Sequence, residues 1–244
     1  MMLLDCGNRN LKAQFFEAEL LRASFAITYD SDWWPRLNQW MQGLPAAHCY
    51  LASVLDAARQ AELEQCLAQQ FGTAVTRFES TARALGVTNG YRQPERLGDD
   101  RWMTLLAAPE ILPGDCVVID AGSAITLDLL RADGQHLGGA ILPGFNTSID
   151  HFRRIFEYID FDHPAIAEVL QPGCSTEAAI HIDYARNTIE ILPELVNRWS
   201  QLFDNDATVL LAGGDAQRVQ RVLEQATRVA PDLVFRGIRR LAQQ

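Results

Sequence analysis

The sequence predicts an α/β protein built from two copies of one mixed-sheet unit, with residues 1–113 forming the first domain and residues 114–244 the second. Three strand-like segments, followed by alternating helical and strand-like segments, occur once in each half. The first strand of each half also ends on an aspartate and a glycine, as Asp5-Cys6-Gly7 and as Asp120-Ala121-Gly122. Duplication of one domain explains the repeated pattern and the repeated motif together.

Apolar runs bounded by turn residues predict the elements of the first half. The expected strands span residues 2–5, 11–18, 20–28, 48–54 and 74–78. The expected helices span residues 32–41, 56–70 and 99–108, and a loop at 86–95 precedes the last of them.

The pattern restarts after a break at Pro113-Gly114. Strands are expected at residues 116–120, 124–130 and 136–142, with Asp133-Gly134 as the hairpin turn between the last two. They are followed by helices at 149–156 and 176–199, a strand at 208–212 and a helix that begins near Asp215.

The composition predicts a compact globular protein, because 48% of the 244 residues are hydrophobic and 21% are charged. The formal charge of -10 argues against non-specific binding to nucleic acid or anionic lipid, and Glu224 and Asp232 interrupt the arginine-rich C-terminal end. Neither a signal peptide nor an apolar stretch long enough to span a membrane is evident, so we expect a soluble cytoplasmic protein. The five cysteines form no Cys-x-x-Cys pair and are expected to be reduced core thiols, and the histidines indicate no transition-metal site.

The repeated Asp-x-Gly motif has the features of a phosphate-binding hairpin. Glycine lets the backbone turn tightly and approach a phosphate, whose oxygens can then accept hydrogen bonds from peptide N–H groups. A carboxylate such as Asp5 beside a nucleotide phosphate requires a divalent cation between them, which points to Mg²⁺. A structural carboxylate in an ordinary turn explains most single matches, but the recurrence favours phosphate binding here. Lys12, the only lysine of the chain, could reach ATP oxygens from the second strand or could equally be a surface lysine.

The segment Gly98-Asp99-Asp100-Arg101 opens a predicted helix, whose free N–H groups favour anions nearby. Asp100 could accept a proton from a substrate hydroxyl, and Arg101 could bind a substrate carboxylate with its two-pronged guanidinium. The alternative is ordinary capping of the helix by Asp99.

Two glycine-rich turns complete the set of motifs. Residues 138–144 combine glycines with a rigid turn before a helix, which could equally be a buried strand and its turn. Gly213-Gly214-Asp215 lies between a strand and a helix and would let an adenine or ribose lie against bare backbone, or it could be a plain connecting turn.

These motifs resemble, in order and spacing over nearly the whole chain, those of type III pantothenate kinase. They are Asp5-Cys6-Gly7-Asn8 with Lys12, residues 94–102, residues 120–128, residues 138–144 and Gly213-Gly214-Asp215. The resemblance implies the actin/hexokinase-like fold, in which two ribonuclease H-like domains each have a mixed five-stranded sheet flanked by helices, with an interdomain cleft. The family phosphorylates pantothenate at the first step of coenzyme A synthesis.

The resemblance also implies roles for individual residues. Asp100 would be the general base, Asp5 would bind Mg²⁺ through phosphate or water, and Asp120 would bind the monovalent cation, K⁺ or NH₄⁺. The ATP-binding residues would be Asp5, Cys6, Gly7, Asn8, Arg9, Asn10, Leu11, Lys12, Ser123, Gly213 and Gly214. Pantothenate would contact Tyr91, Gly98, Asp99, Asp100, Arg101 and Thr176. The family works as a homodimer.

The chain departs from the family pattern at two positions of its phosphate hairpins. Arg9 replaces a usual serine or threonine, and Ser123 replaces a usual threonine but keeps the hydroxyl. Two rival functions stay open at this point. One is a phosphotransferase of the same fold that acts on another small alcohol, and the other is a non-catalytic regulatory protein.

Overall fold

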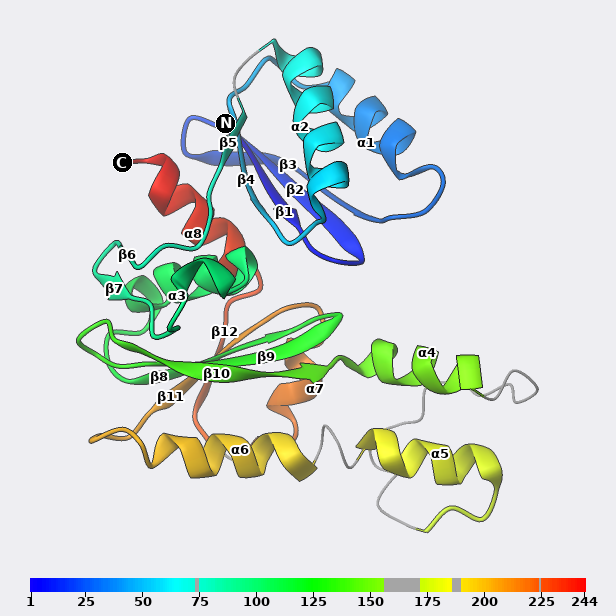
Figure 1. Cartoon of the computed structure of the whole chain (residues 1–244), viewed down its shortest axis with the longest axis vertical. Coiled ribbons are helices and arrows are strands. Elements are labelled where there is room, and N and C mark those ends of the chain that lie inside the picture. Colours follow the sequence, from blue (N-terminus) through cyan, green and yellow to red (C-terminus); the bar gives the residue numbers. More distant parts are fainter. Residues whose placement is uncertain (73–74, 156–171, 186–189, 224) are drawn as a thin grey trace. The chain divides into compact units, whose positions relative to one another are not determined.

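The computed structural model describes residues 1–72, 75–155, 172–185, 190–223 and 225–244 (Figure 1). The chain forms two compact units, Met1–Ile111 with Asp232–Gln244, and Leu112–Pro231. The break near residue 112 lies beside the expected boundary. The C-terminal segment differs from the expectation, because helix α8 (Leu233–Ala242) packs against α3 (Asp99–Ile111), β1 (Met2–Cys6) and β4 (Cys49–Ser53) of the first unit.

The first unit is built on a five-stranded sheet of order β3-β2-β1-β4-β5. Its strands are β1 (Met2–Cys6), β2 (Asn10–Glu17), β3 (Leu20–Thr28), β4 (Cys49–Ser53) and β5 (Val75–Arg77). Its helices, besides α8, are α1 (Trp33–Gln42), α2 (Ala57–Phe71) and α3 (Asp99–Ile111). β1 pairs antiparallel with β2 and parallel with β4. All five strands and all three helices expected in this half are confirmed within a few residues at their ends.

The two faces of this sheet carry different parts of the unit. Strand side chains alternate between faces, so Leu4 and Cys6 point to the side where Leu37 of α1 and Leu63 of α2 complete an apolar core. Asp5 points to the other face, which α3 and α8 cover (Figure 1). Asp56, which directly precedes α2, caps the amino end of this helix by accepting hydrogen bonds from two backbone N–H groups.

The expected loop at 86–95 contains structure that the sequence did not indicate. A small hairpin of β6 (Arg83–Ala84) and β7 (Val87–Thr88) overlaps its start, and a 3₁₀ turn, η1 (Pro94–Arg96), overlaps its end. These short elements escape pattern recognition because they have too few residues to show a hydrophobic period.

The second unit repeats the sheet, with order β10-β9-β8-β11-β12. Its strands are β8 (Cys116–Ala121), β9 (Ala124–Leu130), β10 (His136–Pro143), β11 (Thr208–Ala212) and β12 (Thr227–Val229). Gly134 of the expected hairpin turn has a φ of 85°, which glycine adopts without strain. β12 was not predicted from the sequence.

The described helices of the second unit lie over one face of its sheet. They are α4 (Phe145–Ile155), α5 (Thr176–Ala185), α6 (Ile191–Ser200) and α7 (Ala216–Gln220). Each contributes to a core with Val117, Ile119 and Ala121 of β8, so Asp120 points to the opposite face. α4 begins earlier than the expected residue 149, and residue 156 lies outside the described residues. The expected helix 176–199 is described as α5 and α6, with residues 186–189 outside the described part.

The cysteines are free thiols, as expected, but not all lie in a core. Cys6, Cys49 and Cys116 are buried, whereas Cys66 is half-buried on α2 and Cys174 is exposed. The expectation of five core thiols was therefore wrong for Cys66 and Cys174, because apolar neighbours in sequence do not fix which side of a segment faces the interior.

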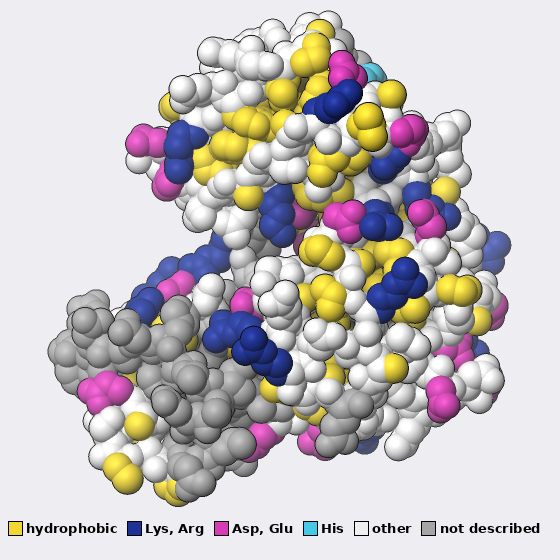
Figure 2. All heavy atoms as spheres, turned by 180° about the vertical axis from the view of Figure 1, so that it is seen from behind, with side chains coloured by type: hydrophobic (Ala, Val, Ile, Leu, Met, Phe, Trp, Pro, Cys, Tyr) yellow, Lys and Arg dark blue, Asp and Glu magenta, His cyan; other side chains and the backbone are white. Residues whose placement is uncertain are grey.

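Basic and acidic side chains are interspersed on the surface that Figure 2 displays. The arginines of α8 pair within the first unit: Arg236 with Asp232, Arg239 with Glu19, and Arg240 with Glu110. The arginines at the C-terminal end therefore belong to a helix that packs on the first unit and forms ion pairs with it. Among the described residues, no helix is both long and apolar enough to cross a membrane.

Candidate active site

The first phosphate hairpin is a tight connection between β1 and β2. The register pairs Cys6 with Leu11, and Gly7 N donates to Asn10 O over 3.0 Å. A β-carbon on Gly7 would lie 3.3 Å from that same oxygen, so the turn leaves little room for a side chain. The outer side of the hairpin is tied to β3, since Thr28 Oγ1 donates to Asn10 Oδ1 over 2.8 Å.

Asp5 and Lys12 face each other across this hairpin. They are paired residues of β1 and β2, so their side chains project from the same face of the sheet. That face is the one covered by α3. A carboxylate and an ammonium group are therefore held on the side of the sheet from which α3 contributes Asp100.

Gly98 and Asp100 define the amino end of α3. A β-carbon on Gly98 would lie 2.6 Å from Asp100 Oδ1 and 3.8 Å from Val54 Cγ1. Val54 follows β4, and its N–H donates to Cys6 O of the phosphate hairpin over 3.0 Å. The Asp100 carboxylate thus rests on bare backbone, close to the residue that fixes the base of the hairpin.

Both carboxylate oxygens of Asp99 accept hydrogen bonds from other groups of the protein. Its carboxylate accepts hydrogen bonds from Ser80 N at 2.9 Å and from Arg77 Nη2 at 3.2 Å. Burial raises the pKa of this carboxyl, and the two hydrogen bonds act in the opposite direction. These contacts make Asp99 a group that fastens the start of α3 to the segment after β5.

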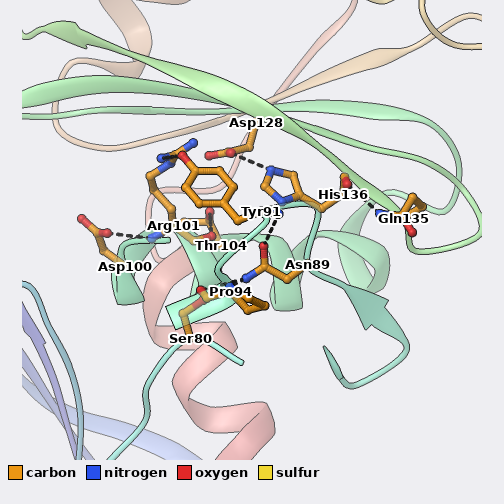
Figure 3. Close-up of polar contacts among 10 residues, drawn as sticks. All are labelled: Ser80, Asn89, Tyr91, Pro94, Asp100, Arg101, Thr104, Asp128, Gln135 and His136. Atoms are coloured by element: carbon orange, nitrogen blue, oxygen red, sulfur yellow. Dashed lines mark hydrogen bonds and ion pairs between the residues drawn. The ribbon is translucent and has the colours of Figure 1, made fainter. Parts of the chain in front are cut away.

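Tyr91 and Arg101 form a polar pair beside Asp100 (Figure 3). Arg101 Nη1 donates to Tyr91 Oη over 2.7 Å, and the guanidinium carbon lies 5.5 Å from the centre of the tyrosine ring. Arg101 is only 4% exposed, and its carbonyl accepts a hydrogen bond from Thr104 Oγ1. A buried arginine held by a phenol is a fitting partner for a carboxylate, which it can bind in bidentate fashion.

The second hairpin joins β8 and β9 in an equally tight turn. Gly122 N donates to Ala124 O over 2.9 Å, and Gly144 N donates to Ser123 O over 3.1 Å. A β-carbon on Gly144 would lie 2.1 Å from Gly122 O, so the turn after β10 must be glycine. Thr147 Oγ1 adds a hydrogen bond to Ser123 O.

The Gly213-Gly214 turn lies directly against this hairpin. Gly213 has a φ of 86°, and a β-carbon there would lie 2.2 Å from Ala121 O and 2.4 Å from Asp120 Oδ1. Asp215 N donates to Ala121 O over 3.0 Å. The structure therefore brings Asp120, Ser123 and Gly213 together at the carboxyl ends of β8 and β11.

An arginine that the sequence did not single out braces the same turn. Arg218 of α7 lies 3.3 Å from Asp215 Oδ1, and its guanidinium stacks 4.5 Å from the centre of the buried Phe145 ring. Thr176, in contrast, is exposed at the start of α5, where Ser175 Oγ accepts from Ala178 N.

Comparison with known proteins decides the family. Residues 1–198 match the family described as type III pantothenate kinase. The chain belongs to the type III pantothenate kinase family. A type III pantothenate kinase of Azotobacter vinelandii is 34% identical over 96% of this chain and 95% of its own length. One of Pseudomonas aeruginosa is 35% identical over 96% of both chains.

Two solved structures share the fold at low identity. The inorganic polyphosphate/ATP-glucomannokinase of an Arthrobacter strain has a TM-score of 0.51 at 14% identity, covering 100% of this chain and 99% of that one. A Sinorhizobium meliloti protein provisionally assigned as 2-dehydro-3-deoxygalactonokinase has a TM-score of 0.62 at 14% identity, covering 99% and 98%. The expected actin/hexokinase-like fold is thereby confirmed.

Membership in the type III pantothenate kinase family confirms the activity expected from the motifs, the phosphorylation of pantothenate in coenzyme A biosynthesis. It makes the chain a kinase, which uses ATP with a divalent metal ion. Among the described residues, no group of three or more histidine, cysteine, aspartate or glutamate side chains could hold a metal ion. A carboxylate that shares Mg²⁺ with substrate phosphates fits this arrangement, since Mg²⁺ is usually held that way.

Residues that hold the candidate site in place but belong to none of the motifs were missed in the sequence. Arg77, Ser80 and Asn89 hold the segment before α3, and Arg218 with Phe145 braces the Gly213-Gly214 turn. Asn89 could have been suspected only from its place before Gly90 in a turn-rich stretch. Arg77 and Ser80 carry no signal, because their partner Asp99 is distant in sequence. Arg218 carries none because Phe145, on which its guanidinium stacks, is distant as well.

Proposed function

We propose that the chain transfers the γ-phosphoryl group of ATP directly to the primary hydroxyl of pantothenate, with Asp100 as the general base. The observation that carries this proposal is the position of the Asp100 carboxylate over Gly98, on the sheet face that also bears Asp5 and Lys12. As the hydroxyl oxygen bonds to the γ-phosphorus, its proton passes to Asp100 and the bond to the ADP oxygen breaks. No covalent enzyme intermediate is needed.

The substrate end of the site is proposed to be the pair of Arg101 and Tyr91. Pantothenate carries a carboxylate, which an arginine can bind. Arg101 directly follows Asp100, is buried, and is the only basic residue of α3. Asp99 supports this pair indirectly, since both of its oxygens already have partners in the protein. We assign Thr176 a contact with pantothenate on the family resemblance alone.

ATP is proposed to be bound by both hairpins. Residues 5–12 offer peptide N–H groups and Lys12 to the phosphates, while Ser123 and the bare backbone at Gly213 and Gly214 receive the rest of the nucleotide. Asp5 would hold Mg²⁺ with the phosphates, and Asp120 would hold K⁺ or NH₄⁺; these ions offset the negative charge of the phosphates. Arg9 supplies a permanent positive charge where the family usually has a hydroxyl.

A homodimer and a cytoplasmic location complete the proposal. The homodimer follows from the family resemblance, and the cytoplasmic location suits an enzyme that consumes ATP, which is abundant there.

The test is ADP release by the purified protein with ATP, Mg²⁺ and pantothenate, in K⁺, NH₄⁺ and Na⁺ buffers. We expect release that needs pantothenate and is faster with K⁺ or NH₄⁺. Asp100→Asn should lower kcat by a factor of about 10² to 10⁴ without changing the melting temperature, because a general base is lost and the fold is not. Asp206→Asn, at an exposed position in the second unit, is the matched control and should behave as the parent.

Two results would contradict the proposal. Turnover by Asp100→Asn near the parent rate would remove Asp100 as the base. No pantothenate-dependent release by the parent in any buffer would redirect the site to another small alcohol.

A further inference from the structure

Asn89 is the centre of a hydrogen-bond network that the mechanism above does not use (Figure 3). The side chain is only 8% exposed. Its Nδ2 lies within hydrogen-bond distance of three acceptors, Ser80 Oγ at 3.1 Å, Thr81 O at 3.2 Å and Pro94 O at 3.2 Å. Its Oδ1 accepts the backbone N–H of Tyr91 at 3.0 Å. Both donors and the acceptor of this one amide are therefore engaged.

The partners of Asn89 lie at both ends of the segment that carries Tyr91. Ser80 and Thr81 precede the β6–β7 hairpin, and Pro94 begins η1. The backbone N–H of Asn89 adds a bond to Ala82 O at 3.0 Å. Because Ser80 N also donates a hydrogen bond to the Asp99 carboxylate, the segment from Ser80 to Pro94 is attached to the start of α3.

The network ends on the pair proposed to bind substrate. Asn89 fixes the backbone of Tyr91, and Tyr91 Oη accepts the hydrogen bond from Arg101 Nη1 at 2.7 Å. A displacement of the Tyr91 backbone would therefore move the phenol away from the guanidinium.

We infer that Asn89 is a positioning residue that sets the affinity for the carboxylate end of pantothenate by holding Tyr91 against Arg101. This inference rests on the proposed role of Arg101. It assigns no contact between Asn89 and substrate. The role requires an amide: an aspartate of the same shape has no N–H, and its charge would face the carbonyl oxygens of Thr81 and Pro94.

The first test compares Asn89→Asp with the parent in steady-state kinetics. We expect KM for pantothenate to rise at least tenfold, because an arginine–carboxylate contact is weakened, while KM for ATP stays within twofold. Asn205→Asp adds the same charge at an exposed position and should leave both constants unchanged. A merely structural role would alter both KM values and kcat together.

Coupling to Tyr91 is tested with Tyr91→Phe and the double variant Asn89→Asp/Tyr91→Phe. If Asn89 acts by placing the Tyr91 hydroxyl, the double variant should have a pantothenate KM close to that of the worse single variant. A KM equal to the product of the two separate effects would overturn the inference.

A milder variant covers the case in which Asn89→Asp does not fold. Asn89→Ser keeps an oxygen that can accept the Tyr91 N–H but cannot span to Pro94, and its pantothenate KM should rise at least threefold. An unchanged KM in a folded Asn89 variant would overturn the inference. Arg101→Lys separates this outcome from a wrong site: if it also leaves KM for pantothenate unchanged, the proposed role of Arg101 is at fault instead.

Discussion

Asp5 and Asp120 occupy corresponding positions in the two separate sheets. Each lies at the end of the central strand, opposite an alanine of the neighbouring parallel strand, Ala52 for Asp5 and Ala212 for Asp120. Across the antiparallel neighbour their partners differ, since Asp5 faces Lys12 and Asp120 faces Thr126. The two carboxylates therefore differ in their cross-strand neighbour, which is an ammonium group for Asp5 and a hydroxyl for Asp120.

Replacing Asp120 by alanine should remove the stimulation of activity by K⁺ or NH₄⁺. The carboxylate is the negative charge proposed to hold the monovalent cation, and its neighbours on β9 and β11 are Thr126 and Ala212. ADP release by Asp120→Ala in K⁺ and Na⁺ buffers should be equally slow. A variant that K⁺ still stimulates as strongly as the parent would assign the cation to another group.

Alanine at Gly213 should destabilise the protein and raise KM for ATP. The added methyl group would meet the backbone oxygen of Ala121, and a φ of 86° is unfavourable for any residue with a β-carbon. We therefore expect a loss of about 1–3 kcal/mol in the free energy of unfolding. Urea denaturation measures the loss. Gly214→Ala is the matched control for stability, because nothing lies within 4 Å of its β-carbon and its φ is ordinary. Equal stability of the two variants would contradict the crowding at Gly213.

Alanine at Gly98 should act on catalysis more than on stability. Its methyl group would lie 2.6 Å from Asp100 Oδ1, the movable end of a side chain, so the carboxylate would shift while the backbone stays in place. We expect kcat to fall at least tenfold with a melting temperature within a few degrees of the parent. Gly43→Ala, whose β-carbon would make an ordinary 3.7 Å contact with Trp40 O, should keep the parent kcat. A Gly98→Ala enzyme with full kcat would argue against Asp100 as the base.

Stability should fall as the pH rises above about 9, the range in which ordinary thiols ionise. Burial raises the pKa of Cys49 and of Cys116 to about 12, and burial also raises the pKa of Cys6. The unfolded chain then loses protons that the folded chain keeps, so the free energy of unfolding decreases by about 1.4 kcal/mol per pH unit for each such thiol. Urea denaturation between pH 8 and about 11 should give a shallower slope for Cys116→Ala than for the parent.

Cys174→Ala is the control for this pH dependence. Its thiol is exposed, so its removal should leave the slope as in the parent. A Cys116→Ala slope identical to that of the parent would show that the Cys116 thiol ionises in the folded protein.

Much of the fold followed from the sequence because its elements are long and periodic. β2 alternates buried and partly buried side chains along most of its length, and four apolar residues follow Thr208 in β11, so the ends of both strands were expected within a residue or two. β12 has three residues and was missed, since so short a strand exists only through its pairing with β11. The domain assignment of α8 failed for a related reason: its amphipathic pattern predicts a buried face but not which sheet receives it.

The candidate site divides in the same way. The sequence by itself indicated the family, because the motifs around Asp5, Asp100, Asp120 and Gly213 occur together in the order and spacing of type III pantothenate kinase. Only the tertiary structure decided which polar groups already have partners within the protein. Asp99 accepts hydrogen bonds from Ser80 and Arg77. The backbone of Tyr91 is bonded to Asn89, and its hydroxyl accepts a hydrogen bond from Arg101. The physical reason is that a motif fixes which groups are present along the chain, whereas hydrogen bonds between distant segments fix where those groups point and which of them are already paired.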